Sequence, residues 1–339
     1  DRTSSPDAVV PGGVFELEAS GRTLRLTLLA DDVVRVHYLP SGGKAHSDRG
    51  WTTVVTSWPG ASLAFDDAGD HYSYKTSKLQ IRVTKKDAAV SFFDPSGTPI
   101  SEDVADQTGG TYLRQVRKKL AVDEHFYGLG EKTGPLDKRG LRLSMWTTDP
   151  LYPQSNYTPT TDPIYQAHPF LHGLKGGKAY GLYLNSTFKT HFDLGQTAPE
   201  ELMLETEGGD LDYFFIYGPE VRRVVELYTG HLVGRMPLPP LWALGYHQCR
   251  WSYYPESKVR QIAAEFRSRK IPCDGLWLDI DYMDGFRSFT WDSSRFPDPP
   301  KLRADLDKDG FKVTAIIDPG IKQDTSGSYK VYDDGISPG

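Results

Sequence analysis

The chain has 339 residues, of which 38% are hydrophobic and 25% are charged, so it can bury an ordinary core and is long enough for two domains. A formal net charge of −6 and the lack of a Lys/Arg block argue against nucleic acid as the main partner. No stretch approaches the roughly 20 apolar residues that span a bilayer, so we expect no membrane partner. Aromatic residues reach 12%, and their amphipathic rings suit stacking on sugars as well as packing in a β-rich core.

The residue types that bind metals and cofactors show no pattern. Cys249 and Cys273 fit no zinc spacing and are predicted to be two buried thiols. The nine histidines are not paired at metal-ligand spacing, so no catalytic metal is predicted. Gly128-Leu129-Gly130 is a lone glycine pair without a dinucleotide fingerprint, and we expect no cofactor.

Residues 1–217 carry many short strand patterns separated by turn signals. Close spacing of such strands predicts an N-terminal β-sandwich. The strongest patterns are at 23–29, 33–38, 79–83, 89–93, 179–184 and 211–217. Between them, residues 130–169 are rich in Pro, Thr, Asp, Tyr and Gly, which predicts one long loop of functional importance.

The pattern changes from strands to helices after Gly218-Pro219. Apolar residues at helical spacing and a proline-rich connector predict a helical linker over 218–240. Residues 241–339 then alternate between strands (242–247, 275–280 and 311–317) and helices (one after Pro255, one over 300–308). This order predicts a parallel sheet with helices outside it.

Polar side chains follow each of the three predicted parallel strands, where the active sites of such folds lie. Strand alternation places Trp277, Asp279 and Asp281 on one face and the leucines on the other, so the carboxylates should point away from the helices. A buried carboxylate is costly unless it is hydrogen-bonded or functional. Asp279 is the stronger functional candidate, whereas Asp281 is better explained as a structural hydrogen-bond acceptor. For Asp318, a ligand role and a turn-bracing role are equally supported.

Four motifs in the same order resemble glycoside hydrolase family 31. They are Phe-Tyr-Gly-Leu-Gly-Glu at 126–131, Pro-Leu-Trp-Ala-Leu-Gly-Tyr-His-Gln-Cys-Arg-Trp at 240–251, Leu-Asp-Ile-Asp-Tyr-Met-Asp at 278–284 and Ile-Asp-Pro-Gly-Ile-Lys at 317–322. The resemblance implies an N-terminal β-sandwich, whose long loop reaches the active site, followed by the first three βα units of a (β/α)8 TIM barrel. The Asp-Ile-Asp-Tyr-Met form resembles the α-glucosidase branch rather than the α-xylosidase branch.

The resemblance also assigns substrate-binding residues. Asp149 matches a loop aspartate that helps to form the sugar site, and Asp279 matches the aspartate that binds hydroxyls of the non-reducing glucose. Matches to residues that line or adjoin the pocket are Trp251, Trp277, Ile280, Ile316 and Asp318.

The family's catalytic residues have no counterpart here. The nucleophile is an aspartate in a Trp-x-Asp-Met motif after the fourth strand, the acid/base follows the sixth, and this chain has no such motif. The resemblance therefore implies a retaining hydrolase of terminal α-linked glucose that acts on α-glucosides or oligosaccharides. Its barrel would be completed either by a companion C-terminal polypeptide or by further residues of a longer chain of which this sequence is a truncated part. An α-glucosyltransferase, an α-xylosidase and a non-catalytic carbohydrate-binding fragment stay open as alternatives.

Overall fold

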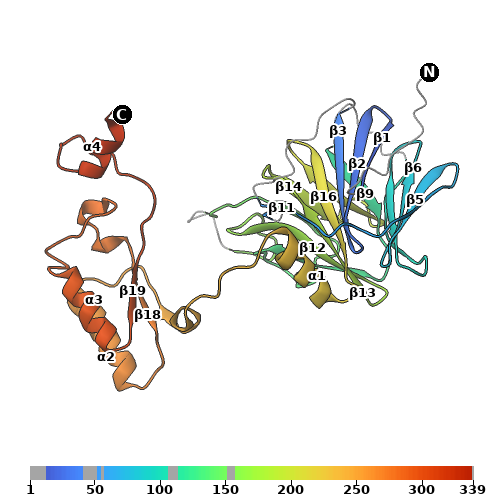
Figure 1. Ribbon diagram of the computed structural model, residues 1–339. Coiled ribbons are helices and arrows are strands. Elements are labelled where there is room, and N and C mark those ends of the chain that lie inside the picture. The colour runs from blue at the N-terminus through green and yellow to red at the C-terminus, as the bar shows by residue number, and fades with distance from the viewer. Residues whose placement is uncertain (1–12, 41–51, 55–56, 106–113, 151–156, 338–339) are drawn as a thin grey trace. The chain divides into compact units, whose positions relative to one another are not determined.

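The computed structural model describes residues 13–40, 52–54, 57–105, 114–150 and 157–337. The chain divides into two compact units, residues 1–235 and residues 236–339, and each is described by itself (Figure 1).

The first unit is built on a seven-stranded sheet in which all neighbouring strands are antiparallel. Its strand order is β1-β2-β3-β16-β13-β12-β10. The bounds are β1 Val14–Ala19, β2 Arg22–Ala30, β3 Val33–Pro40, β10 Glu124–Gly130, β12 Ala167–Lys175, β13 Lys178–Leu184 and β16 Leu211–Tyr217. The strands predicted at 23–29, 33–38, 179–184 and 211–217 are thereby confirmed.

Two smaller sheets complete the first unit, one with the order β4-β5-β6-β7-β8 and one with the order β11-β14-β15-β9. The bounds of the first are β4 Ala64–Asp67, β5 His71–Lys75, β6 Gln80–Thr84, β7 Val90–Phe93 and β8 Pro99–Glu102. The bounds of the second are β9 Gln115–Lys119, β11 Arg142–Met145, β14 Thr190–Leu194 and β15 Glu201–Thr206. The prediction of one long loop over 130–169 is corrected, because β11 pairs with β14 inside this range and β12 begins before its end.

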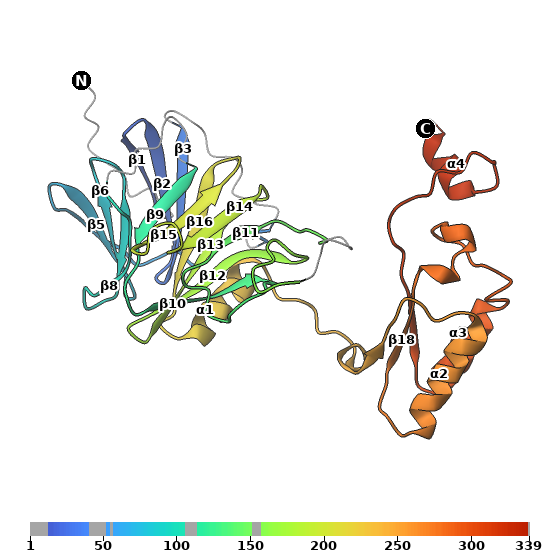
Figure 2. The same ribbon diagram turned by 180° about the vertical axis from the view of Figure 1, so that it is seen from behind.

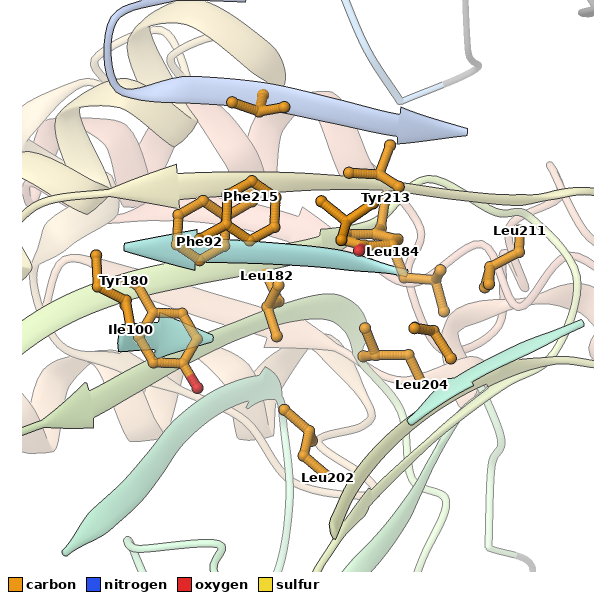
Figure 3. Packing of buried hydrophobic residues seen from close by; sticks show 14 of the residues in the cluster. Phe92, Ile100, Tyr180, Leu182, Leu184, Leu202, Leu204, Leu211, Tyr213 and Phe215 are labelled. Atoms are coloured by element: carbon orange, nitrogen blue, oxygen red, sulfur yellow. The ribbon is translucent and has the colours of Figure 1, made fainter. Parts of the chain in front are cut away.

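The sandwich core forms where all three sheets bury apolar side chains in one cluster. Phe92 of β7 and Phe215 of β16 stack with ring centroids 3.9 Å apart, so the five-stranded sheet is held directly against the seven-stranded one (Figure 3). Leu204 of β15 brings the four-stranded sheet into the same cluster. Strand β16 is buried on both faces, and its even-numbered residues Phe214 and Ile216 belong to a second cluster on the other side.

That other side of the seven-stranded sheet is covered by a helix. Helix α1 Val221–Leu227 runs into a π-helical turn, Tyr228–Leu232, and the ring of Tyr228 stacks on Phe170 of β12 at 3.8 Å. Val224 and Leu227 are buried in the same cluster. The helix predicted as part of a linker over 218–240 therefore packs on the sandwich in this structure.

The second unit contains a parallel three-stranded sheet, β17-β18-β19. Helices α2 and α3 lie side by side in both views and bury Val259, Ala263, Leu302 and Leu306 against Leu276 and Leu278 of β18 (Figures 1 and 2). The bounds are β17 His247–Gln248, α2 Glu256–Ser268, β18 Gly275–Leu278, α3 Pro299–Lys308, β19 Lys312–Ala315 and α4 Lys330–Ile336.

Local chemistry explains where these elements begin. Helix α3 begins after Asp298, whose side chain accepts the N–H of Lys301 at 3.0 Å, and prolines occupy the first turn, where a missing N–H costs nothing.

The first predicted strand of the second unit, 242–247, is corrected, because residues 241–244 form a 3₁₀ turn and only His247 and Gln248 pair with β18. Gly245 closes that turn by donating its N–H to the carbonyl of Trp242.

Candidate active site

Six of the seven predicted site residues lie in the second unit, after or within its parallel strands. Because parallel strands end at the same edge of a sheet, residues that follow β17, β18 and β19 meet there. Trp251 follows β17, Asp279 follows β18 directly, and Asp318 follows β19. The remaining residue, Asp149, belongs to the sandwich unit.

Asp279 is half-buried and begins the 3₁₀ turn Ile280–Tyr282. Its Oδ1 accepts the backbone N–H of Ile280 at 2.8 Å, which fixes the plane of the carboxylate. Oδ2 has no hydrogen-bond partner within the described residues. One oxygen is therefore held in place, and the other is available to accept a hydroxyl of a ligand.

The thiol of Cys249 lies close enough to Asp279 to respond to its charge. Desolvation, with a contribution from the negative charge of Asp279, raises the pKa of Cys249. The thiol therefore stays neutral beside the carboxylate. The prediction of two buried thiols is right for Cys273 and wrong for Cys249, which is exposed.

Trp277 lies on the face of β18 that the helices do not cover, as strand alternation predicts. Its indole Nε1–H donates to Nδ1 of His247 at 3.0 Å, and Nε2 of His247 lies 3.0 Å from the carbonyl oxygen of Trp242. This arrangement requires a neutral imidazole with its proton on Nε2. Sequence reasoning missed His247, since nothing in the pattern of a two-residue strand identifies its partners.

Backbone hydrogen bonds fix the positions of the site residues that follow β19. The N–H of Ile316 donates to the carbonyl of Leu278 at 3.0 Å, and the Ile316 carbonyl accepts the hydroxyl of Tyr282 at 2.8 Å. Ile316 itself is exposed, and Ile280 is half-buried. Asp318 is exposed and left-handed, with φ of +50°, and its carbonyl accepts the N–H of Gly320.

Asp281 differs from the sequence-based expectation. Since β18 ends at Leu278, strand alternation does not extend to residue 281, and the 3₁₀ turn places Asp281 in a buried position. Its Oδ2 accepts the indole N–H of Trp251 at 3.0 Å, and Arg295 approaches it from a later loop. The shared face predicted for Trp277, Asp279 and Asp281 is therefore corrected for Asp281.

Asp149 is exposed in the loop between β11 and β12. The N–H of Thr148 donates to the carbonyl of Ile164 at 3.2 Å, which brings the two sides of the loop together. Hydrogen bonds with Tyr157 and Asp149 raise the pKa of Tyr165 above its usual value, so the Tyr165 hydroxyl lies beside the Asp149 carboxylate. A role for Asp149 alongside the other six residues stays a prediction.

The described residues also bear on metals and membranes. Among them, His, Cys, Asp and Glu side chains form no group of three or more that could hold a metal ion. Every helix in the part of the chain that the structure describes is too short or too polar to cross a membrane.

Two family models match the chain in succession. Residues 23–193 match the glycosyl hydrolase 31 N-terminal galactose mutarotase-like domain, and residues 236–339 match the glycosyl hydrolases family 31 TIM-barrel domain.

Relatives agree with these matches. "Alpha-glucosidase 2" of Bacillus thermoamyloliquefaciens is 39% identical over 95% of this chain and 40% of that protein. "Alpha-xylosidase 1" of Arabidopsis thaliana is 34% identical over 74% of this chain and 26% of that protein. The structure of a GH31 dextranase of Flavobacterium johnsoniae complexed with glucose is 31% identical over 95% of this chain and 40% of that chain, with a TM-score of 0.83.

This chain thus spans two fifths or less of the length of each of these three proteins. The two domain matches follow each other in the same order as the sandwich and the parallel sheet. The chain therefore belongs to glycoside hydrolase family 31, and it comprises the family's N-terminal domain and the beginning of its TIM barrel.

Proposed function

We propose that this chain is the N-terminal portion of a retaining glycoside hydrolase that releases α-linked glucose from the non-reducing end of α-glucosides or malto-oligosaccharides. Residues 1–217 supply the sandwich and its active-site loop, residues 218–240 link it to the barrel, and residues 241–339 supply the first three βα units. Both catalytic aspartates lie beyond this chain.

The observation that carries the proposal is the half-buried carboxylate of Asp279 at the carboxyl edge of the parallel sheet. It keeps one oxygen available and adjoins a face that exposes Trp277 and Ile316. A carboxylate accepts sugar hydroxyls, and aromatic and aliphatic side chains cover the apolar C–H faces of the ring. The 39% identity to an α-glucosidase over nearly the whole chain favours glucose as that sugar.

In the proposed reaction, two carboxyl groups about 5 Å apart flank the glycosidic bond. One attacks the anomeric carbon and the other protonates the leaving oxygen, after which water hydrolyses the glycosyl-enzyme intermediate. The residues of this chain act by binding and orientation. Asp279 and Asp149 hold hydroxyls of the terminal glucose, so that the anomeric carbon lies in line with the nucleophile.

A second activity is favoured by particular relatives. The chain is similar to an α-xylosidase and to a dextranase, so α-xylosidase, dextranase or α-glucosyltransferase activity on the same scaffold is the alternative. We would assay the complete enzyme on maltose, isomaltotriose, an α-xyloside and dextran, and follow the products by NMR. Release of α-glucose from maltose with retention supports the proposal. Turnover of the xyloside alone or of dextran alone, inversion, or no turnover contradicts it.

The barrel is proposed to be completed by further residues, in a companion C-terminal polypeptide. The relatives' greater length supports the need for such residues. Intact mass spectrometry under denaturing conditions tests this point directly. A second polypeptide of a few hundred residues that copurifies supports it, whereas a single active species of 37.9 kDa contradicts it.

A further inference from the structure

The indole ring of Trp251 is unusual in being highly exposed and yet anchored. Its exposed fraction in this chain is 74%, but its Nε1–H donates to the buried carboxylate of Asp281 at 3.0 Å. The polar end of the ring is fixed while its faces stay open. Such an arrangement restricts the ring to few orientations before any ligand binds.

The anchor is itself held in place. Asp281 is 9% exposed, and its backbone carbonyl accepts a hydrogen bond from Nη1 of Arg295 at 3.1 Å. The same Nη1 lies 3.8 Å from Oδ1 of Asp281, so the buried negative charge faces a positive one. A buried carboxylate without these partners would be costly, and here both of its oxygens are engaged.

Arg295 connects this anchor to the segment that follows Trp251. Its guanidinium lies 4.6 Å from the ring centroid of Tyr254, and its backbone carbonyl accepts the N–H of Glu256 at 2.9 Å. The Nε atom of Arg295 lies 3.3 Å from Oδ2 of Asp292. The loop after β17 and the loop after β18 are therefore tied together through a single network around Trp251.

We propose that Asp281, supported by Arg295, is a positioning residue that presents the face of the Trp251 indole as a rigid stacking platform for the pyranose ring of the substrate. Asp281 does not touch the sugar in this arrangement. It acts by removing the rotamer freedom that Trp251 would otherwise lose on binding, so its contribution falls on substrate binding rather than on bond cleavage. The inference rests on the proposed function and adds a residue and a role to it.

A double-mutant cycle in the complete enzyme tests the inference. Asp281→Leu cannot accept the indole N–H and should raise KM for maltose about tenfold with kcat within about threefold, in line with one lost hydrogen bond and a freed ring. Asp281→Asn keeps an acceptor and should change KM less than about threefold. In the Trp251→Phe background, which has no N–H to anchor, Asp281→Leu should raise KM no further.

Asp305→Asn is the matched control, because Asp305 also pairs with an arginine, Arg260 at 3.1 Å, but on helices α2 and α3. It should leave KM unchanged. If Asp281→Leu fails to fold, Trp251→Phe measures the same bond from the donor side and should raise KM at least about threefold. An unchanged KM in either variant, or an equal effect of Asp281→Leu in both backgrounds, overturns the inference. A wild-type enzyme without activity on any α-glucoside would instead contradict the proposed function.

Discussion

At the scale of single residues, the two carboxylates of the Asp-Ile-Asp sequence have different surroundings although they are only two positions apart. One carboxylate oxygen of Asp279 accepts a hydrogen bond from the turn that Asp279 begins, and the other is available to a ligand. The carboxylate of Asp281 is instead buried against Trp251 and Arg295. The 3₁₀ turn creates the difference, since it turns the second carboxylate away from the open face of the sheet. We therefore propose that Asp279, and not Asp281, binds the ligand.

Replacement of Asp279 by alanine should accordingly reduce kcat/KM of the complete enzyme for maltose by more than about 100-fold. Loss of a hydroxyl contact that orients the terminal glucose misplaces the reacting carbon as well as weakening binding. Steady-state kinetics and thermal unfolding would be measured together. The control is Asp307→Ala. Asp307 lies on α3, and its carboxylate pairs with Lys312 of β19. A loss below threefold for Asp279→Ala would contradict its assigned role.

Glu124 offers a pH-dependent test of the sandwich core. It is buried and accepts a hydrogen bond from Tyr180, and desolvation raises its pKa above the usual value. The folded state then holds the proton more tightly than the unfolded state. Its contribution to stability is fully present below the unfolded pKa of about 4.3 and is lost as pH rises through the folded pKa.

Glu124→Gln, which cannot ionise, should therefore become more stable relative to the wild type as pH rises from 4 to 7. Urea midpoints at several pH values would measure this difference. Glu205→Gln, at a partly exposed position on β15, is the control for the substitution itself. A stability difference between Glu124→Gln and wild type that is constant with pH would contradict the direction of the shift.

At the scale of elements, α1 closes the outer face of the seven-stranded sheet. Leu227 is buried there against residues of β3, β12, β13 and β16. Leu227→Ala should lower the free energy of unfolding by about 2–5 kcal/mol, because it removes apolar contacts and leaves a cavity. Val225→Ala, on the exposed side of the same helix, should change it by less than about 1 kcal/mol. Denaturant unfolding of both variants gives the comparison, and equal effects would contradict this packing.

The sequence predicted most strands of the sandwich because their alternation is strong and each is bounded by turn residues. It failed at 242–247, where apolar residues suggested a strand. There a 3₁₀ turn closes between Trp242 and Gly245, and β17 is left with two residues. It also extended β18 too far, because the side chain of Asp279 takes the N–H of Ile280 and ends the strand.

The candidate active site could likewise be predicted from the sequence only in part. The strand-end positions of Asp279 and Asp318 follow from alternation of strands and helices alone. The hydrogen bond from Trp251 to Asp281 crosses 30 positions, and the support from Arg295 comes from an irregular loop. Such contacts depend on tertiary packing, which leaves no periodic pattern in the sequence.

At the scale of the whole molecule, the two aspartates that the family resemblance assigns to the sugar belong to different units, Asp149 to the sandwich and Asp279 to the barrel segment. If both carboxylates bind the same glucose, losing either one misplaces it, and the second loss then costs less than the first. Asp149→Ala and Asp279→Ala should therefore be non-additive in the complete enzyme, with a coupling of about 1 kcal/mol or more in kcat/KM for maltose.

The matched comparison is Asp162→Ala with Asp279→Ala. Asp162 lies in the same loop as Asp149, but its carboxylate pairs with Lys132 at 2.7 Å and so stabilises the loop. Its loss should lower stability, and any kinetic effect should add to that of Asp279→Ala without coupling, since the two side chains share no partner. Additive effects for Asp149 and Asp279, measured as kcat/KM of the two single variants and the double variant, would place the two aspartates at separate sites and would remove the loop from the proposed glucose pocket.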